Sequence, residues 1–339
     1  AGYLILEVQA ELENAIPNIS MKYDPEITDD DFALVCVKCA LKTAKPSFAN
    51  HRMFKNELGE NYVIASCYNG LLLGGGAYTL CRLILGHIAE RSAGIEDFKN
   101  NQLPYVMDVM AKYMDARIAF EVEQSGFFES NFLAKEGLIH RDRFTGMFGL
   151  VGLADAVNVL MTKEGKDDRF GHSDAATQLG VEIMDIINEF NNNHFNKYCE
   201  GTGSHFLLHA QVGIAEDKGI APGTRIPIGE EPEELVDHLN VISNFHKYFV
   251  SGTGDIFPVD LTVHKNPEYV LDIIKGSWQK DIRYLSFYSS DSDVIRITGY
   301  LVKRSEIEKY EQSNAVLQNT TQLGTGAKKN GRILERKVR

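Results

Sequence analysis

The sequence predicts an α/β fold, and three observations point to it. Residues 259–263, 267–280 and 282–288 read as an apolar strand, a helix and a second apolar strand, which is the order of a β-α-β unit. Another short apolar strand, residues 148–153, turns directly into a predicted helix at 154–161. The chain has 339 residues and is 44% hydrophobic, which is ample for a large core, and α/β barrels of this size often form one domain.

The composition indicates an acidic protein of a reducing cytoplasm. The net charge is −12 and the pI is near 5.4, so the basic footprint that neutralises a nucleic acid is missing over most of the chain. The most apolar run, residues 70–85, contains three consecutive glycines and Arg82, so no signal peptide or membrane span is predicted. The cysteines are odd in number and have no disulfide spacing: Cys36, Cys39, Cys67, Cys81 and Cys199.

The first elements are a helix that ends before Pro17, a strand at residues 19–23 and a second helix opened by Thr28 as the first residue of a capping box. Cys36 and Cys39 fall on one face of this second helix. They could form a metal or redox pair, but no second cysteine pair or histidine at ligand spacing accompanies them. We therefore expect both thiols to pack in the core.

An apolar strand that begins at Tyr62 leads to Cys67 and then to the run Gly74-Gly75-Gly76, and a further strand is predicted at residues 78–85. A buried cysteine is most often an inert small hydrophobe, and a glycine run is most often a turn. Neither feature is specific by itself. The apolar residues that precede Cys67 would raise the pKa of its thiol and keep it protonated.

The middle of the chain offers weaker signals. Residues 103–124 predict a long helix that begins near Pro104, and Ser173 is a good N-cap for a helix that runs to about residue 194. His205 and His209 lie four residues apart and would face the same way on a helix. No third ligand is indicated nearby, so no metal site is predicted.

Two stretches in the last third are predicted as strands that end in glycine turns, residues 222–229 and residues 244–255. His246 and Asp255 belong to the second stretch. Because α/β folds place ligands at the ends of their strands, these two polar residues are candidates for substrate binding.

Residues 294–302 read as a buried strand, except that Gly299 interrupts them. A glycine inside a strand costs backbone entropy and packing, so it usually marks a bulge, a bend or a close approach of another segment. The alternative is that a side chain is chemically excluded. A radical on a backbone Cα must be planar to delocalise between its amide nitrogen and carbonyl, and a β-carbon would crowd that plane.

The sequence around Gly299, Arg-Ile-Thr-Gly-Tyr-Leu, closely resembles the radical-bearing loop of the glycyl radical enzymes. The region of Cys67 resembles the active-site segment of the anaerobic ribonucleotide reductases in the same superfamily, in which a Pro-x-Phe-Ala-Asn stretch, here residues 46–50, precedes the cysteine. Together with the Phe-Gly-Leu-Val-Gly-Leu turn at 148–153 and the His-Ala-Gln-Val-Gly segment at 209–213, the order of motifs looks most like the YjjI family.

This resemblance covers nearly the whole chain and implies a ten-stranded α/β barrel of the glycyl radical enzyme type. The barrel would occupy residues 1–303, with a cysteine loop at 62–78 and a glycine radical loop at 294–302, and residues 304–339 would form a tail. Family members are longer at the N-terminus, and the chain opens at Ala1 in an apolar pattern, so we expect an N-terminally incomplete barrel.

The resemblance also implies the chemistry. Gly299 would store a radical and pass it to Cys67, whose thiyl radical would take a hydrogen atom from a small-molecule substrate under anaerobic conditions, with Asn69, His246 and Asp255 as candidates for substrate binding. Because the chain has no iron–sulfur cysteine cluster, a separate S-adenosylmethionine radical activase would install the radical, and a homodimer is the expected assembly. The Cys67 sulfur and the Gly299 Cα are predicted to lie within about 6 Å.

Three departures limit which reaction is implied. Formate acetyltransferases carry two adjacent cysteines, whereas Ser66 precedes Cys67 here, and the glycyl radical dehydratases place a glutamate where this chain has Asn69. The zinc-site cysteines of the anaerobic reductases have no counterpart in residues 275–300. A lyase, a transferase or a reductase all stay open. So do nucleotide reduction, a replacement radical domain without catalysis of its own, and a binding barrel.

Overall fold

The computed structural model of the chain describes residues 1–65, 68–210, 220–297, 299–316 and 335–339. Its larger sheet has the strand order β1-β2-β9-β8. The pairs β1–β2 and β8–β9 are parallel, and β2–β9 is antiparallel. The strands span Ser20–Tyr23 in β1, Ser47–Asn50 in β2, Tyr284–Ser289 in β9 and Asp255–Val259 in β8.

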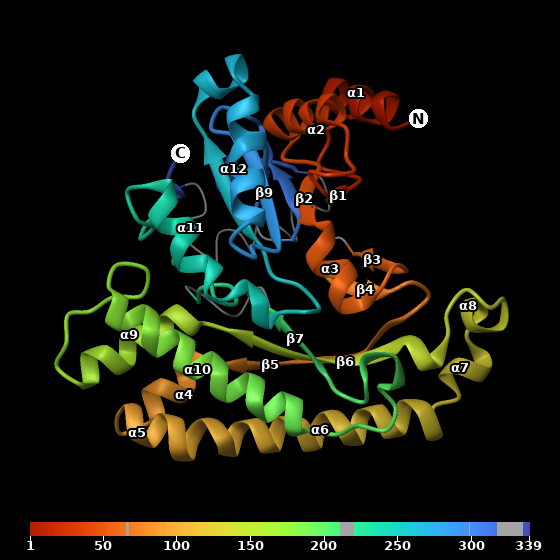
Figure 1. Ribbon diagram of the computed structural model, residues 1–339, viewed down its shortest axis with the longest axis vertical. Helices are drawn as coiled ribbons and strands as arrows, with labels where there is room; N and C mark the ends of the chain where they lie inside the picture. Colours follow the sequence, from red (N-terminus) through yellow and green to blue (C-terminus); the bar gives the residue numbers. More distant parts are fainter. Residues whose placement is uncertain (66–67, 211–219, 298, 317–334) are drawn as a thin grey trace.

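Helices cover one face of this sheet (Figure 1). They are α1 (Gly2–Leu12), α2 (Asp30–Thr43), α11 (Leu235–Ser243) and α12 (Glu268–Trp278). Phe48, Phe257 and Phe287 point from the strands into the same buried cluster as Val37 of α2 and Ile274 of α12. Since side chains alternate across a strand, Tyr284 and Tyr288 of β9 point to the opposite face.

The start of α2 shows why the sequence folds locally as it does. The N-cap is Asp29, whose carboxylate accepts a hydrogen bond from the Phe32 N–H at 3.0 Å. The predicted cap, Thr28, instead accepts from the Asp24 N–H. Cys36 and Cys39 are buried in the helical core of the larger sheet, as predicted. Burial raises the pKa of Cys36 to about 12.

The second sheet is fully parallel and has the order β5-β6-β7, with β5 at Gly76–Ile84, β6 at Phe144–Val151 and β7 at Leu207–Ala210. Helices α4 (Leu85–Arg91), α6 (Leu103–Glu123), α9 (Leu153–Lys163) and α10 (Asp174–Asn193) pack against it and share its apolar cluster (Figure 1). Phe148 in β6 and Met114 in α6 are fully buried there. The predicted strands at 78–85 and 148–153 and the long helix at 103–124 are thereby confirmed in type.

Two antiparallel hairpins carry the segments of interest. Strands β3 (Tyr62–Ile64) and β4 (Gly70–Leu72) enclose residues 65–69, which we call the cysteine turn. Strands β10 (Val294–Arg296) and β11 (Leu301–Lys303) enclose residues 297–300, which we call the glycine turn. Helix α3 (His51–Leu58) joins β2 to β3. The shorter helices are α5 (Ile95–Asp97), α7 (Phe127–Ser130), α8 (Phe132–Lys135) and α13 (Arg304–Glu311).

Three predicted elements are wrong or displaced. Residues 222–229 form turns rather than a strand, and His246–Tyr248 is a 3-10 turn rather than part of a strand. The predicted strand at 259–263 is found four residues earlier, as β8, because the Asp260 carboxylate accepts from the Thr262 N–H and starts a 3-10 turn at Leu261–Lys265. Pro258 is tolerated in β8 because β8 is the last strand of its sheet.

The α/β class is confirmed, and the β-α-β unit is present as β8-α12-β9. The described strands fall into four separate sheets, and none of these sheets closes on itself. The ten-stranded barrel, its N-terminal incompleteness and the division of the chain at residue 303 therefore stay predictions. None of the helices that the structure describes is both long and apolar enough to cross a bilayer.

Candidate active site

Backbone contacts fix the described residues that flank Cys67 in the cysteine turn. Ser66 and Cys67 lie outside the described residues, but both flanks are described. The Ala65 N–H donates to the Asn69 carbonyl at 2.9 Å and closes the turn. Tyr68 has a φ of 61°, a left-handed conformation that is uncommon for a residue with a side chain. Backbone strain of this kind persists only where the surroundings enforce it.

The surroundings that enforce it are residues 251 and 252. The Gly70 N–H donates to the Ser251 carbonyl at 2.9 Å. A β-carbon at Gly252 would lie 2.0 Å from the Tyr68 carbonyl oxygen, and the φ of Gly252 is +122°. Only glycine allows this approach. The residue that follows Cys67 is thus fixed against a distant segment of the chain.

Aromatic and cationic groups surround the buried Tyr68 ring. Its centroid lies 5.6 Å from the Tyr284 ring, 6.3 Å from the His209 ring and 5.5 Å from the Arg225 guanidinium carbon. The Arg225 Nε donates to the Gly254 carbonyl at 2.5 Å. Three separate segments, β7, residues 220–229 and β9, therefore converge on the cysteine turn.

Three buried polar atoms beside the cysteine turn have no hydrogen-bond partner among the residues that the structure describes: Asn69 Oδ1, His209 Nδ1 and Arg225 Nη2. Burial lowers the pKa of His209 to about 4, although a hydrogen bond with the Ser251 backbone opposes the shift. His209 is therefore neutral near pH 7. Buried polar atoms are nearly always satisfied in native proteins, so these three make the region a candidate ligand site.

His246 and Asp255, the other predicted substrate-binding residues, bind each other. The His246 Nδ1 accepts from the Arg283 N–H at 3.0 Å, so its Nε2 carries the proton and donates to Asp255 Oδ2 at 3.0 Å. Burial lowers the pKa of His246 and keeps the imidazole neutral. Burial alone would raise the pKa of Asp255, but its histidine partners His238 and His246 outweigh that effect and hold it below the ordinary range. Their contact with substrate stays a prediction.

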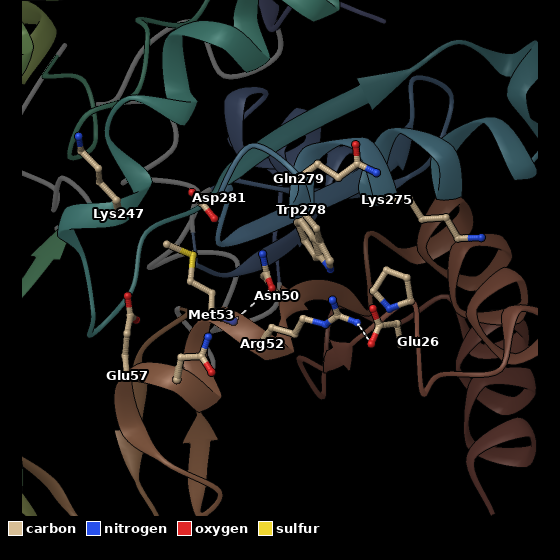
Figure 2. A pocket seen from close by; sticks show the side chains of 12 residues that line it. Glu26, Asn50, Arg52, Met53, Glu57, Lys247, Lys275, Trp278, Gln279 and Asp281 are labelled. Carbon is tan, nitrogen blue, oxygen red and sulfur yellow. Dashed lines mark hydrogen bonds and ion pairs between the residues drawn. The ribbon is translucent and has the colours of Figure 1, made fainter.

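A separate polar pocket of about 680 Å³ lies between α3 and the end of α12, and Figure 2 shows its lining side chains. Arg52 pairs there with Glu26 at 2.6 Å. Lys275, another lining residue, pairs with Asp30 at 2.7 Å. Glu57 forms a two-pronged ion pair with the buried Arg283. Neither Asn69 nor Gly299 lines this pocket, so it is not the site at the cysteine turn.

The glycine turn is held by side chains from distant segments. Gly299 is buried, and the Ile297 N–H donates to the Tyr300 carbonyl at 3.1 Å. The Asn18 Nδ2 donates to the Gly299 carbonyl at 3.0 Å, while Asn18 Oδ1 accepts from Arg296 at 2.8 Å. Arg336 donates to the carbonyls of Arg296 and Ile297 at 2.9 and 3.1 Å. Arg336, near the end of the chain, thus contacts the glycine turn.

One short segment connects the two turns. Asn18 binds the Gly299 carbonyl, and two residues later Ser20 Oγ forms a 2.6 Å hydrogen bond with the Tyr284 hydroxyl. The ring of Tyr284 packs against Tyr68. Two residues of extended chain span at most about 7 Å, so the same stretch of backbone serves both turns. The predicted distance between Cys67 and Gly299 involves a residue outside the described part of the chain and stays a prediction.

The whole chain, residues 1–339, matches the family described as "Glycyl radical enzyme YjjI-like". The chain belongs to this family. A relative from Haemophilus influenzae, described as "Uncharacterized protein", is 45% identical over 342 residues, which cover 100% of this chain and 66% of the relative. The Escherichia coli K12 protein described as "Uncharacterized protein YjjI" is 42% identical over 336 residues, which cover 99% and 64%. The chain therefore spans about two thirds of the length of these curated relatives.

Solved structures of other glycyl radical enzymes share the fold of this YjjI-like chain. A glycyl radical enzyme from Archaeoglobus fulgidus matches with a TM-score of 0.72 at 13% identity, over 98% of this chain and 54% of that one. An anaerobic ribonucleotide reductase matches with 0.69 at 16% identity, over 93% and 58%. The B12-independent glycerol dehydratase of Clostridium butyricum matches with 0.68 at 13%, over 99% and 54%. The predicted family is confirmed, and at these identities the structures show the fold alone.

Sequence reasoning missed four residues of the YjjI-like site. The spacing of His205 and His209 suggests a shared helical face, yet His209 lies in β7 and His205 binds the His194 carbonyl. No cluster of histidine, cysteine and acidic residues suited to a metal occurs in the described ranges. Arg225 lies in residues 222–229, for which the sequence predicts a strand and the structure shows turns. Asn18 and Arg336 carry no local signal, because their partners are distant in the sequence.

Proposed function

We propose that this YjjI-like chain carries the radical machinery of an enzyme in which Gly299 stores a radical and Cys67 uses it to take a hydrogen atom from a small molecule. The observation that carries the proposal is the segment Asn18–Ser20, which binds the Gly299 carbonyl at one end and the Tyr284–Tyr68 pair beside Cys67 at the other. Radical transfer over a short distance needs both turns to be positioned by one rigid frame.

The surroundings of Gly299 suit a stored radical. The residue is buried, which keeps solvent away, and it has no β-carbon to crowd a planar Cα. The unpaired electron delocalises onto the Gly299 carbonyl, and the hydrogen bond from Asn18 stabilises electron density on that oxygen. A separate S-adenosylmethionine radical activase, as the expected partner, supplies the organic radical that removes one hydrogen atom from the Gly299 Cα.

The second step is a hydrogen-atom exchange inside the protein. The Cys67 S–H bond breaks, its hydrogen atom restores the second C–H bond of Gly299, and the unpaired electron remains on sulfur. The sulfur radical then takes a hydrogen atom from a substrate C–H bond, which restores the thiol and leaves a substrate radical. This exchange requires a neutral thiol. The apolar residues Val63 and Ile64 that precede Cys67 favour that form.

The relay can be tested without knowing the substrate. Full-length protein is activated anaerobically with its activase, first in H₂O and then in D₂O, and the electron paramagnetic resonance signal is recorded. The remaining Cα hydrogen splits the glycyl signal into a doublet. Thiol hydrogens exchange with solvent, so repeated transfer between Cys67 and Gly299 should place deuterium on Gly299 and collapse the doublet in D₂O.

The variants separate the two residues' roles. Cys67→Ser should form the radical but keep its doublet in D₂O, because a serine O–H bond is too strong to give up its hydrogen atom. Gly299→Ala should give no glycyl signal. A wild-type doublet that persists in D₂O, or a collapse in Cys67→Ser, would refute the relay through Cys67. A signal in Gly299→Ala would refute the radical site and favour a binding role for the chain.

A further inference from the structure

We propose that Arg225 binds an anionic group of the substrate, a carboxylate or a phosphate, and that Asn69 and His209 bind a neighbouring hydroxyl of the same molecule. The proposal rests on the function proposed above, because it places the substrate beside Cys67. It adds the chemical class of that substrate: a small anion that carries a hydroxyl group.

Arg225 is a buried cation whose charge is only partly balanced by neighbouring groups. Its side chain belongs to a residue that is only 8% exposed, and its single hydrogen bond among the described residues joins Nε to the Gly254 carbonyl. No ion pair found among the described residues includes it. Nη2 has no hydrogen-bond partner in the described part of the chain. A buried charge of this kind is costly unless another group pairs with it, so the site favours an incoming anion.

The carboxylate of Asp255, which acts on Arg225, already has other partners. Asp255 interacts electrostatically with Arg225, but one of its oxygens accepts from His246 at 3.0 Å and the other lies 3.6 Å from His238 Nε2. The carboxylate therefore offsets part of the Arg225 charge from a distance and leaves the guanidinium free to bind. Arginine suits this task because its planar N–H groups match carboxylate and phosphate oxygens.

The other two atoms, Asn69 Oδ1 and His209 Nδ1, indicate which further groups the ligand carries. Asn69 Oδ1 is a pure acceptor, so it calls for a donor such as a hydroxyl rather than for an anion. His209 is neutral at pH 7, so it adds no charge and offers one further polar contact through Nδ1. His209 and Arg225 lie against the ring of Tyr68, which follows Cys67 and precedes Asn69 in the chain. A hydroxylated anion bound here would have its C–H bonds close to the cysteine turn.

The experiment uses three probes with one carbon skeleton: glycerol, glycerate and glycerol 3-phosphate. Their binding to full-length protein, not activated and therefore free of radical, is measured by titration calorimetry. At least one anion should bind about tenfold or more tighter than glycerol, and the two anions distinguish a carboxylate site from a phosphate site. Arg225→Gln should weaken anion binding about ten- to hundredfold and leave glycerol unchanged.

Two further variants keep the test decisive. Arg117→Gln, on the exposed face of α6, changes the net charge equally and should leave all three affinities unchanged. Should Arg225→Gln fail to fold, Asn69→Asp places a like charge beside the anion and should abolish anion binding. Equal binding of the three probes, no saturable binding of either anion, or unchanged anion affinity in the variants would overturn the proposal. The glycyl radical signal of these variants reports on the radical function separately, since anion binding is not needed to form it.

Discussion

The cysteine turn and the glycine turn both lie at hairpin ends, but their described residues are fixed by different means. The cysteine turn is held by backbone contacts, namely the strained Tyr68 and the close approach of Gly252. The glycine turn is held by the side chains of Asn18 and Arg336, which donate to its carbonyls. Backbone contacts cannot be released without unfolding, whereas side-chain hydrogen bonds can. This difference suits the proposed function, in which Cys67 stays in place and Gly299 first meets an activase.

Gly252→Ala should have the largest effect, because it attacks the backbone contact of the cysteine turn. The new methyl group would clash with the Tyr68 carbonyl at a φ that disfavours any side chain. We expect the free energy of unfolding in urea to fall by about 3 kcal/mol or more. Gly276→Ala in α12 is the matched control, because a β-carbon there meets nothing within 4 Å. The Gly276→Ala change should be neutral or stabilise the protein by up to about 1 kcal/mol. An equal loss of stability in both variants would show that the close approach of Gly252 to Tyr68 is not what holds the cysteine turn.

Lowering the pH should destabilise the surroundings of the cysteine turn before it affects the glycine turn. The pKa of His209 is about 4 in the folded protein and near 6.5 in the unfolded chain, so the unfolded state binds the proton first. Stability from neutral His209 is present above about pH 6.5 and is lost as the pH falls towards 4. Between pH 7 and pH 5 the loss is about 2 kcal/mol. The arginines that hold the glycine turn do not titrate in this range.

The measurement compares urea unfolding of wild type and His209→Gln at both pH values. The glutamine variant should lose less stability on acidification than wild type does. If the free energy of unfolding changes equally with pH in the two proteins, His209 is not the group beside the cysteine turn that makes the protein sensitive to acid.

Arg336→Ala should have the smallest effect and should act on the glycine turn alone. Two buried carbonyls lose their donor, which costs about 1–2 kcal/mol locally. Hydrogen exchange should accelerate in peptides of residues 294–303 and stay unchanged in residues 62–72. Lys337→Ala is the control, because its ion pair is with the exposed Glu233 and contributes little. Faster exchange in both hairpins would show that the two turns are not held independently.

Several parts of the fold followed from local patterns, and the failures have physical causes. The β-α-β unit was predictable because each of its elements has its own hydrophobic period. The turns at residues 222–229 were not predictable, because the apolar side chains of this segment are buried or half-buried although its backbone pairs with none of the described strands. Ile226 contacts the backbone position of Gly171, and the Arg225 N–H donates to the Pro222 carbonyl within a turn. A short apolar run does not reveal whether its backbone pairs with a strand.

The sequence by itself predicts the two chemical positions, Gly299 and Cys67, because each is indicated by its own residue type and its immediate neighbours. Only the tertiary structure decided what surrounds them. Asn18 reaches Gly299 across 281 positions of the chain, and Arg225 reaches the cysteine turn from a segment with no regular structure. Such contacts depend on how distant segments pack, and a local sequence pattern carries no record of them.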